Sequence, residues 1–131
     1  MSLSQAVMEP VDIQELFVHR DILSSDDIEK IVRAASGTQA AEFERMVERL
    51  RVEATQTGDH QKAVRAGIGL FFIGKPDEAA SLLDGSSDGI ARYYRAQALS
   101  TLGRHEEAAS EFEEAAQKGY DPIDCTLRRA G

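Results

Sequence analysis

Three short stretches of the sequence share one order of residues: GDHQKA begins at Gly58, GKPDEA at Gly74 and GRHEEA at Gly103. In each, charged or turn-forming residues follow the glycine, and an alanine stands five residues after it. Glycine ends a helix at little cost because it accepts the left-handed backbone conformation, and acidic residues favour the positive end of the next helix. An alanine one turn into that helix lets two antiparallel helices approach closely. The repetition therefore predicts stacked helical hairpins.

The N-terminal part of the chain also follows helical spacing. We expect three helices there, over residues 11–19, 26–37 and 38–57, and Asp26 and Thr38 fit as N-caps of the second and third. No run of alternating apolar and β-branched residues indicates a strand. We therefore expect an all-α chain in which three N-terminal helices precede the hairpins.

The segment from Gly69 to Lys75 matches G-x-x-x-x-G-K, most of a nucleotide-binding P-loop. A P-loop cradles phosphate with backbone N–H groups, and the Ser or Thr after its Lys binds magnesium. Here Pro76 follows the Lys, and a loop would expose the apolar run 70–73 to water. A turn at Gly74 accounts for the same residues, because proline suits the first turn of a following helix. We therefore expect a turn and no nucleotide site.

No other group of residues has the arrangement of a catalytic, metal or cofactor site. VHRDI at residues 18–22 resembles a kinase catalytic loop, but no D-F-G follows it. His60 and His105 stand at equivalent turn positions, where packing is a better interpretation than metal binding. We expect one acidic cluster on the outer face of its helix: Glu106, Glu107, Glu111, Glu113 and Glu114.

Charge and composition narrow the classes of partner. The 131 residues include 15 Lys plus Arg and 23 Asp plus Glu, for a formal net charge of −8. Because the acidic excess occurs in both halves of the chain, nucleic acid and anionic membrane surfaces are poor partners. The longest apolar run is too short to span a bilayer. The single cysteine, Cys125, fits a reducing compartment, most simply the cytoplasm.

Residues 93–122 resemble a tetratricopeptide repeat (TPR), a helical hairpin in which small and large apolar positions recur. Gly103 stands at the turn between its two helices. The other matching positions are Ala96, Leu99, Ala108, Phe112 and Ala115. Pro122 comes two residues later than in the family pattern, and Arg92 and Arg95 stand where Trp and Leu are usual.

A weaker copy of the pattern covers residues 60–83. Gly74 and Gly103 are 29 residues apart, whereas equivalent points in the family are separated by about 34. Because the deficit falls in residues 84–89, we expect the second helix of the weaker copy to stop about one turn early. The resemblance implies a short TPR-like α-solenoid of stacked antiparallel hairpins.

In the TPR family, the first helix of each hairpin lines a concave groove that binds an extended peptide or a helix of a partner. Carried over to this sequence, the resemblance implies these groove residues: Arg65, Ile68, Phe72, Tyr94, Gln97 and Thr101. The alternative is that Ile68 and Phe72 are buried beneath the N-terminal helices. The resemblance implies a non-catalytic protein–protein interaction module. A small TPR-type chaperone for exported proteins is the alternative, and a regulatory domain of an enzyme is the third class.

We expect one domain over residues 1–131, with N-terminal helices in 11–57 and about two TPR-like hairpins in 60–122. Residues 123–131 begin like the first helix of a further hairpin and then stop. In a repeat array, each unit buries its apolar face against the next. We therefore expect the parent protein to be longer. In the isolated chain, we expect the C-terminal end to be covered by self-association or to be left frayed.

Overall fold

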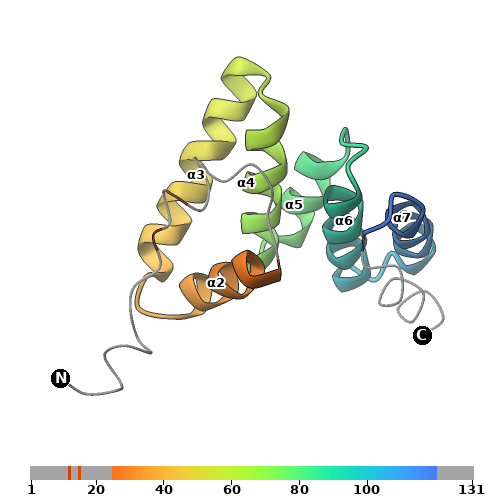
Figure 1. Cartoon of the computed structure of the whole chain (residues 1–131), viewed down its shortest axis with the longest axis horizontal. Coiled ribbons are helices and arrows are strands. Elements are labelled where there is room, and N and C mark those ends of the chain that lie inside the picture. The colour runs from red at the N-terminus through yellow and green to blue at the C-terminus, as the bar shows by residue number, and fades with distance from the viewer. Residues whose placement is uncertain (1–11, 13–14, 16–24, 121–131) are drawn as a thin grey trace.

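The structure, a computed structural model, describes Asp12, Glu15 and residues 25–120. The long stretch contains helices and turns and no β-strand (Figure 1), so the predicted all-α class is confirmed for the described residues. Its helices, in chain order, are α2 (Ser25–Ser36), α3 (Ala40–Thr57), α4 (His60–Phe72), α5 (Pro76–Leu83), α6 (Gly89–Thr101) and α7 (His105–Gln117).

The helix boundaries match the sequence-based prediction with small shifts. The predicted second and third helices are α2 and α3. Because α2 begins at Ser25, Asp26 lies within it and is not its N-cap. Thr38 is not the N-cap of α3; Gln39 occupies that position without a side-chain capping bond, and the entry turn is closed by a hydrogen bond from Ala40 N to Gly37 O. The predicted helix over residues 11–19 lies almost entirely outside the described residues, as do Pro122 and the segment 123–131.

The predicted glycine turns are confirmed. Gly58, Gly74 and Gly103 have φ angles of 71°, 87° and 81°, in the left-handed region that glycine adopts without strain. At the second of these turns, Lys75 N donates to Leu70 O at 2.9 Å, and Pro76 is the first residue of α5. The segment that resembles a P-loop is therefore the end of one helix, a turn and the start of the next.

Consecutive helices from α3 to α7 pack against one another, and α4 also contacts α6. Helix α2 lies across the end of the α3–α4 pair at which α3 begins (Figure 1) and touches both helices. The largest fully buried apolar side chains come from five of the six helices: Ile31, Phe43, Val47, Leu50, Ile68, Leu70, Leu83 and Leu99. The core is therefore one apolar cluster that runs along the helix stack.

Helix α4 lies between α3 and α5, and glycines allow both contacts to be close. A Cβ atom built at Gly69 would lie 2.4 Å from Val47 Cγ2 on α3, and one at Gly67 would lie 2.6 Å from Leu83 Cδ2 on α5. Both separations are far below ordinary carbon–carbon contact distances of 3.5–4.0 Å. Larger residues would push the neighbouring helices away. Helix α5 itself ends at Leu83 after 8 residues, which confirms the predicted early stop.

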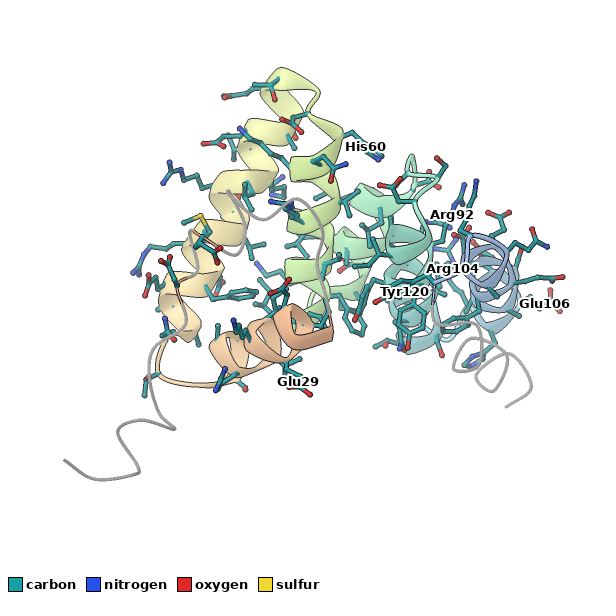
Figure 2. All side chains as sticks on the ribbon, in the orientation of Figure 1. Glu29, His60, Arg92, Arg104, Glu106 and Tyr120 are labelled. Carbon is teal, nitrogen blue, oxygen red and sulfur yellow. The ribbon has the colours of Figure 1, made fainter. Side chains whose placement is uncertain are left out.

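The contact of α6 with α7 contains buried charges. Glu111 on α7 is only 8% exposed, and its carboxylate accepts hydrogen bonds from Arg92 Nη1 at 2.9 and 3.1 Å and from Arg95 Nη1 at 3.0 Å. The expectation that Glu111 lies on the outer face of its helix is therefore wrong, because two guanidinium groups from α6 pair with it. Figure 2 shows Arg92 on the side of α6 that faces α7.

The same arginines reach further partners. Arg92 Nε lies 3.3 Å from Glu114 Oε2, and Arg95 Nε donates to Ala80 O on α5 at 3.1 Å. Arg95 Nη2 also pairs with Asp84 Oδ1 at 3.2 Å. The hydrogen bond with Glu111 raises the pKa of Arg92 above its usual value. The positions where the TPR pattern has Trp and Leu thus hold an ionic cluster that joins α5, α6 and α7.

Candidate functional site

The residues predicted to line a groove differ widely in exposure. Ile68 is completely buried, and Tyr94 and Arg65 are 6% and 7% exposed. Phe72 and Gln97 are half-buried, whereas Thr101 is exposed. The alternative that Ile68 belongs to the core matches its burial, and Phe72 packs against the core while keeping part of its surface in solvent.

The structure brings several of these residues together across α4 and α6. The rings of Phe72 and Tyr94 lie 5.5 Å apart, centroid to centroid. Gln97 donates a hydrogen bond to the hydroxyl of Tyr93 at 3.0 Å, and Thr101 donates to the backbone oxygen of Gln97 at 2.9 Å. Contacts within and between the helices therefore use much of the polar and aromatic surface that a groove would offer.

An aromatic chain extends this contact towards the end of the described stretch. Tyr93 lies 5.1 Å from Tyr94, 5.6 Å from Phe112 and 5.2 Å from Tyr120, again between ring centroids. Edge-to-face rings at such distances add stabilisation beyond the area they bury. This row of aromatic rings fixes the position of Tyr120, which follows α7 (Figure 2).

A cleft of about 500 Å³ opens beside Tyr120, between the first turns of α4 and α6 and the end of α7. Of the six predicted groove residues, Arg65 alone lines it. The full lining is Gln61, Val64, Arg65, Ser87, Asp88, Gly89, Ile90, Lys118, Gly119 and Tyr120. The other nine lining residues were not among those that the sequence predicted. The turn at Gly119 is the feature of the sequence that could have indicated one wall.

Local chain geometry explains how the walls form. After α7 the backbone turns at Gly119, which has a φ of 82°, and Tyr120 N donates to Ala115 O at 3.1 Å. This is a helix end closed by a left-handed glycine. Gly89 lets α6 begin close to this turn, since a Cβ there would lie 2.9 Å from Tyr120 Cβ and 3.1 Å from Lys118 Cβ.

The third wall is the connection between α5 and α6, which His60 holds in place. The imidazole Nε2 of His60 lies 3.2 Å from Asp88 Oδ2 and 3.3 Å from Ser86 Oγ. Asp88 N in turn donates to Ser86 Oγ at 3.2 Å. We call these three residues the His60 bridge. Figure 2 shows His60 at the end of α4 from which it reaches the connection.

The packing interpretation of the two histidines is not what the structure shows. The His60 side chain is 49% exposed and makes polar contacts. His105 is also exposed, and within the described residues it has no hydrogen bond or ion pair. The difference arises because the α5–α6 connection passes the start of α4. Periodicity along the chain cannot reveal such a contact.

The charges around the cleft are mixed, with a positive excess. Arg65 and Lys118 contribute cations, and Asp88 is the one carboxylate among the lining residues. Asp88 stands at the N-cap of α6 but makes no side-chain capping bond, because its carboxylate faces His60. The remaining lining offers the apolar surfaces of Val64 and Ile90 together with amide and hydroxyl groups.

Searches across known protein families, curated proteins and solved structures found no match to this chain. Residues 25–120 contain no helix that is long and apolar enough to cross a membrane. In the same stretch, no three His, Cys, Asp or Glu side chains are grouped so that they could hold a metal ion. The cleft is thus the feature of the described residues from which a function can be argued.

Proposed function

We propose that this chain is a non-catalytic protein–protein interaction module built as a short TPR-like α-solenoid. The packing supports the architecture: α4 and α6, the first helices of the two hairpins, contact each other, and each also contacts the helix on either side. The single cysteine of the sequence favours action in a reducing compartment, the cytoplasm.

The observation that carries the proposal is the cleft between the first turns of α4 and α6. Its volume, about 500 Å³, lies within the usual range for ligand sites. It combines apolar surface from Val64, Ile90 and Tyr120 with the donors of Gln61 and Arg65. Such a mixture suits a peptide segment, whose side chains supply apolar surface and whose backbone supplies hydrogen-bond acceptors.

A selection experiment tests the proposal. A phage-displayed peptide library is panned on the purified chain, and the affinities of the selected peptides are measured by fluorescence polarisation. We expect Ile90→Ala to weaken their binding about tenfold, because it removes apolar surface from the lining of the cleft.

The control is Leu102→Ala, which removes an exposed apolar side chain (40% exposed) at the opposite end of α6. It should leave the affinities unchanged. Circular dichroism verifies that both variants remain folded. Selected peptides that bind the Ile90→Ala variant as tightly as the native chain would contradict the proposal.

A further inference from the structure

The charge around the cleft contrasts with that of the whole chain. The chain carries a formal net charge of −8, yet two of the three charged lining residues are cations. Arg65 comes from α4 and Lys118 from the end of α7, so elements distant in sequence deliver positive charge to one place. An acidic protein that brings two cations together at one cleft favours an anionic occupant there.

The one carboxylate of the lining opposes such an occupant less than its formal charge suggests. Asp88 Oδ2 is 3.2 Å from His60 Nε2, and His60 lies outside the lining of the cleft. A hydrogen bond from the imidazole disperses part of the carboxylate charge. The Asp88 carboxylate is therefore already paired with His60, which reduces its repulsion of an anionic occupant.

The two cations differ in solvent exposure, and this decides what each contributes. Arg65 is 93% buried, since only 7% of it is exposed, and charge–charge attraction is stronger where water is excluded. Its guanidinium has five N–H donors, so it can bind a carboxylate in addition to contacts within the protein. Lys118 is exposed, and its attraction is weakened by salt.

We propose that the cleft binds an internal segment of a partner protein in which an Asp or Glu side chain stands near an apolar side chain. The carboxylate pairs with Arg65 and Lys118, and the apolar side chain contacts Ile90 and the ring of Tyr120. This inference rests on the proposed function, because it specifies the chemistry of the peptide that occupies the same cleft.

The test uses an array of synthetic octapeptides, acetylated and amidated so that they carry no terminal carboxylate. Each has one Glu and one Leu in a Gly/Ser background, at every relative spacing. A matched copy replaces Glu with Gln, and a second replaces it with Lys. Affinities of the best spacing are measured by calorimetry in 50 and 500 mM NaCl.

We expect the Glu peptide to bind at least tenfold more tightly than its Gln copy in low salt, because a hydrogen-bonded ion pair is lost in the copy. The Lys copy should not bind measurably. Lys118→Gln should weaken binding of the Glu peptide about threefold, and Lys118→Glu should weaken it more. The matched control is Lys75→Gln, on the α4–α5 turn outside the lining, and it should have no effect.

Arg65→Lys tests the second cation while preserving the charge. We expect it to weaken binding of the Glu peptide severalfold, because an ammonium group cannot replace the two-pronged geometry of guanidinium. Circular dichroism shows whether the variant is folded, and the Lys118 variants keep the test decisive if it is not.

The outcomes separate this inference from the proposed function. If Glu and Gln peptides bind equally and Ile90→Ala weakens both, the cleft binds peptides without regard to charge, and the inference is wrong while the function stands. If no peptide of either kind binds in a manner that depends on Ile90, both proposals fail. Tight Glu binding that is unchanged in Lys118→Glu and Arg65→Lys also overturns the inference.

Discussion

Helices α4 and α6 occupy comparable positions, each between two neighbours, and both have apolar contacts, but α6 also takes part in an ionic cluster around the buried Glu111. Around α4, the close contacts are apolar: Gly69 faces Val47 of α3, and Gly67 faces Leu83 of α5. Around α6, Arg92 and Arg95 pair with Glu111 of α7, and Arg95 also reaches α5. The same helical spacing is therefore compatible with a close contact at glycines, which have no side chain, and with a contact between paired charges.

The difference teaches which substitutions each contact tolerates. An apolar contact depends on volume, so adding one carbon is costly. A buried ionic contact is stable only when every charge in it keeps a partner, because each charge has lost its contacts with water. The ionic cluster in addition orients α5, α6 and α7 through directional hydrogen bonds, which apolar contacts cannot do. Four predictions test this contrast, from the largest expected effect to the smallest.

Glu111→Ala should cause the largest loss of stability. It removes the carboxylate that Arg92 and Arg95 share and leaves two largely buried guanidinium groups without it, which costs about 3–5 kcal/mol. Urea unfolding followed by circular dichroism measures the change in the free energy of unfolding. The control Glu106→Ala, at an exposed position in the first turn of α7 (Figure 2), should change it by less than about 0.5 kcal/mol.

A triple replacement sharpens the same prediction. Arg92→Leu, Arg95→Leu and Glu111→Leu together remove all three central charges, and we expect a chain that is about as stable as the native one or up to about 4 kcal/mol more stable. If Glu111→Ala alone costs less than about 1 kcal/mol, the cluster does not hold the three helices as described.

Gly69→Ala should break the apolar contact. The new Cβ would lie 2.4 Å from Val47 Cγ2, and overpacking of this kind costs about 1–3 kcal/mol. Thermal unfolding measures the loss. Adding Val47→Ala should recover part of it by making room, whereas the control Gly85→Ala, with no atom within 4 Å of its new Cβ, should be close to neutral. A stable Gly69→Ala variant would mean that α3 and α4 lie further apart.

The two regions meet at the His60 bridge, so His60→Ala tests their coupling. It removes the contacts of His60 Nε2 with Asp88 and Ser86, and we expect a loss of about 0.5–1.5 kcal/mol. Hydrogen exchange of the amides of residues 87–90 should become faster. His105→Ala, at the equivalent position of the next hairpin, should alter neither quantity. Equal effects of the two variants would contradict a specific role for the bridge.

The smallest effect concerns ion pairs at the surface of α3, one of which joins α3 to α4. A hydrogen bond from Arg51 lowers the pKa of Glu48, and hydrogen bonds from Lys62 and Arg49 lower the pKa of Glu53, in each case from the usual 4.5. A carboxyl group whose pKa is lowered by folding stabilises the native state above that usual value. This stabilisation disappears as pH falls through the lower, native pKa.

Stability should therefore decrease slightly below about pH 4.5, and the double variant Glu48→Gln/Glu53→Gln should show less of this decrease. Melting temperatures between pH 7 and pH 3 measure it. Because these three ion pairs are exposed or only partly buried and are screened by water, the difference should be far smaller than the effect of Glu111→Ala. Identical acid profiles for the native and double-variant chains would show that these pairs contribute nothing to stability.

The sequence by itself determined where the chain turns and which segments between the turns are helical. Gly58, Gly74 and Gly103 end helices because a left-handed residue is a local requirement, and a local requirement is visible in a local pattern. The early end of α5 at Leu83 followed from the spacing of Gly74 and Gly103, compared with the longer repeat that the TPR resemblance implies. Even the misassigned cap at Thr38 was displaced by one residue only.

Only the tertiary structure decided which side chains face solvent and which enclose the cleft. From the sequence, Glu111 is predicted to belong to an acidic outer face, but in the structure the guanidinium groups of α6 pair with it. Ile68 and Tyr94 are predicted to line a groove, but in the structure neighbouring helices bury them. The cleft unites α4, the α5–α6 connection and the end of α7. These features depend on partners distant in sequence, whose positions follow from how helices pack, and helical periodicity records only which residues share a face.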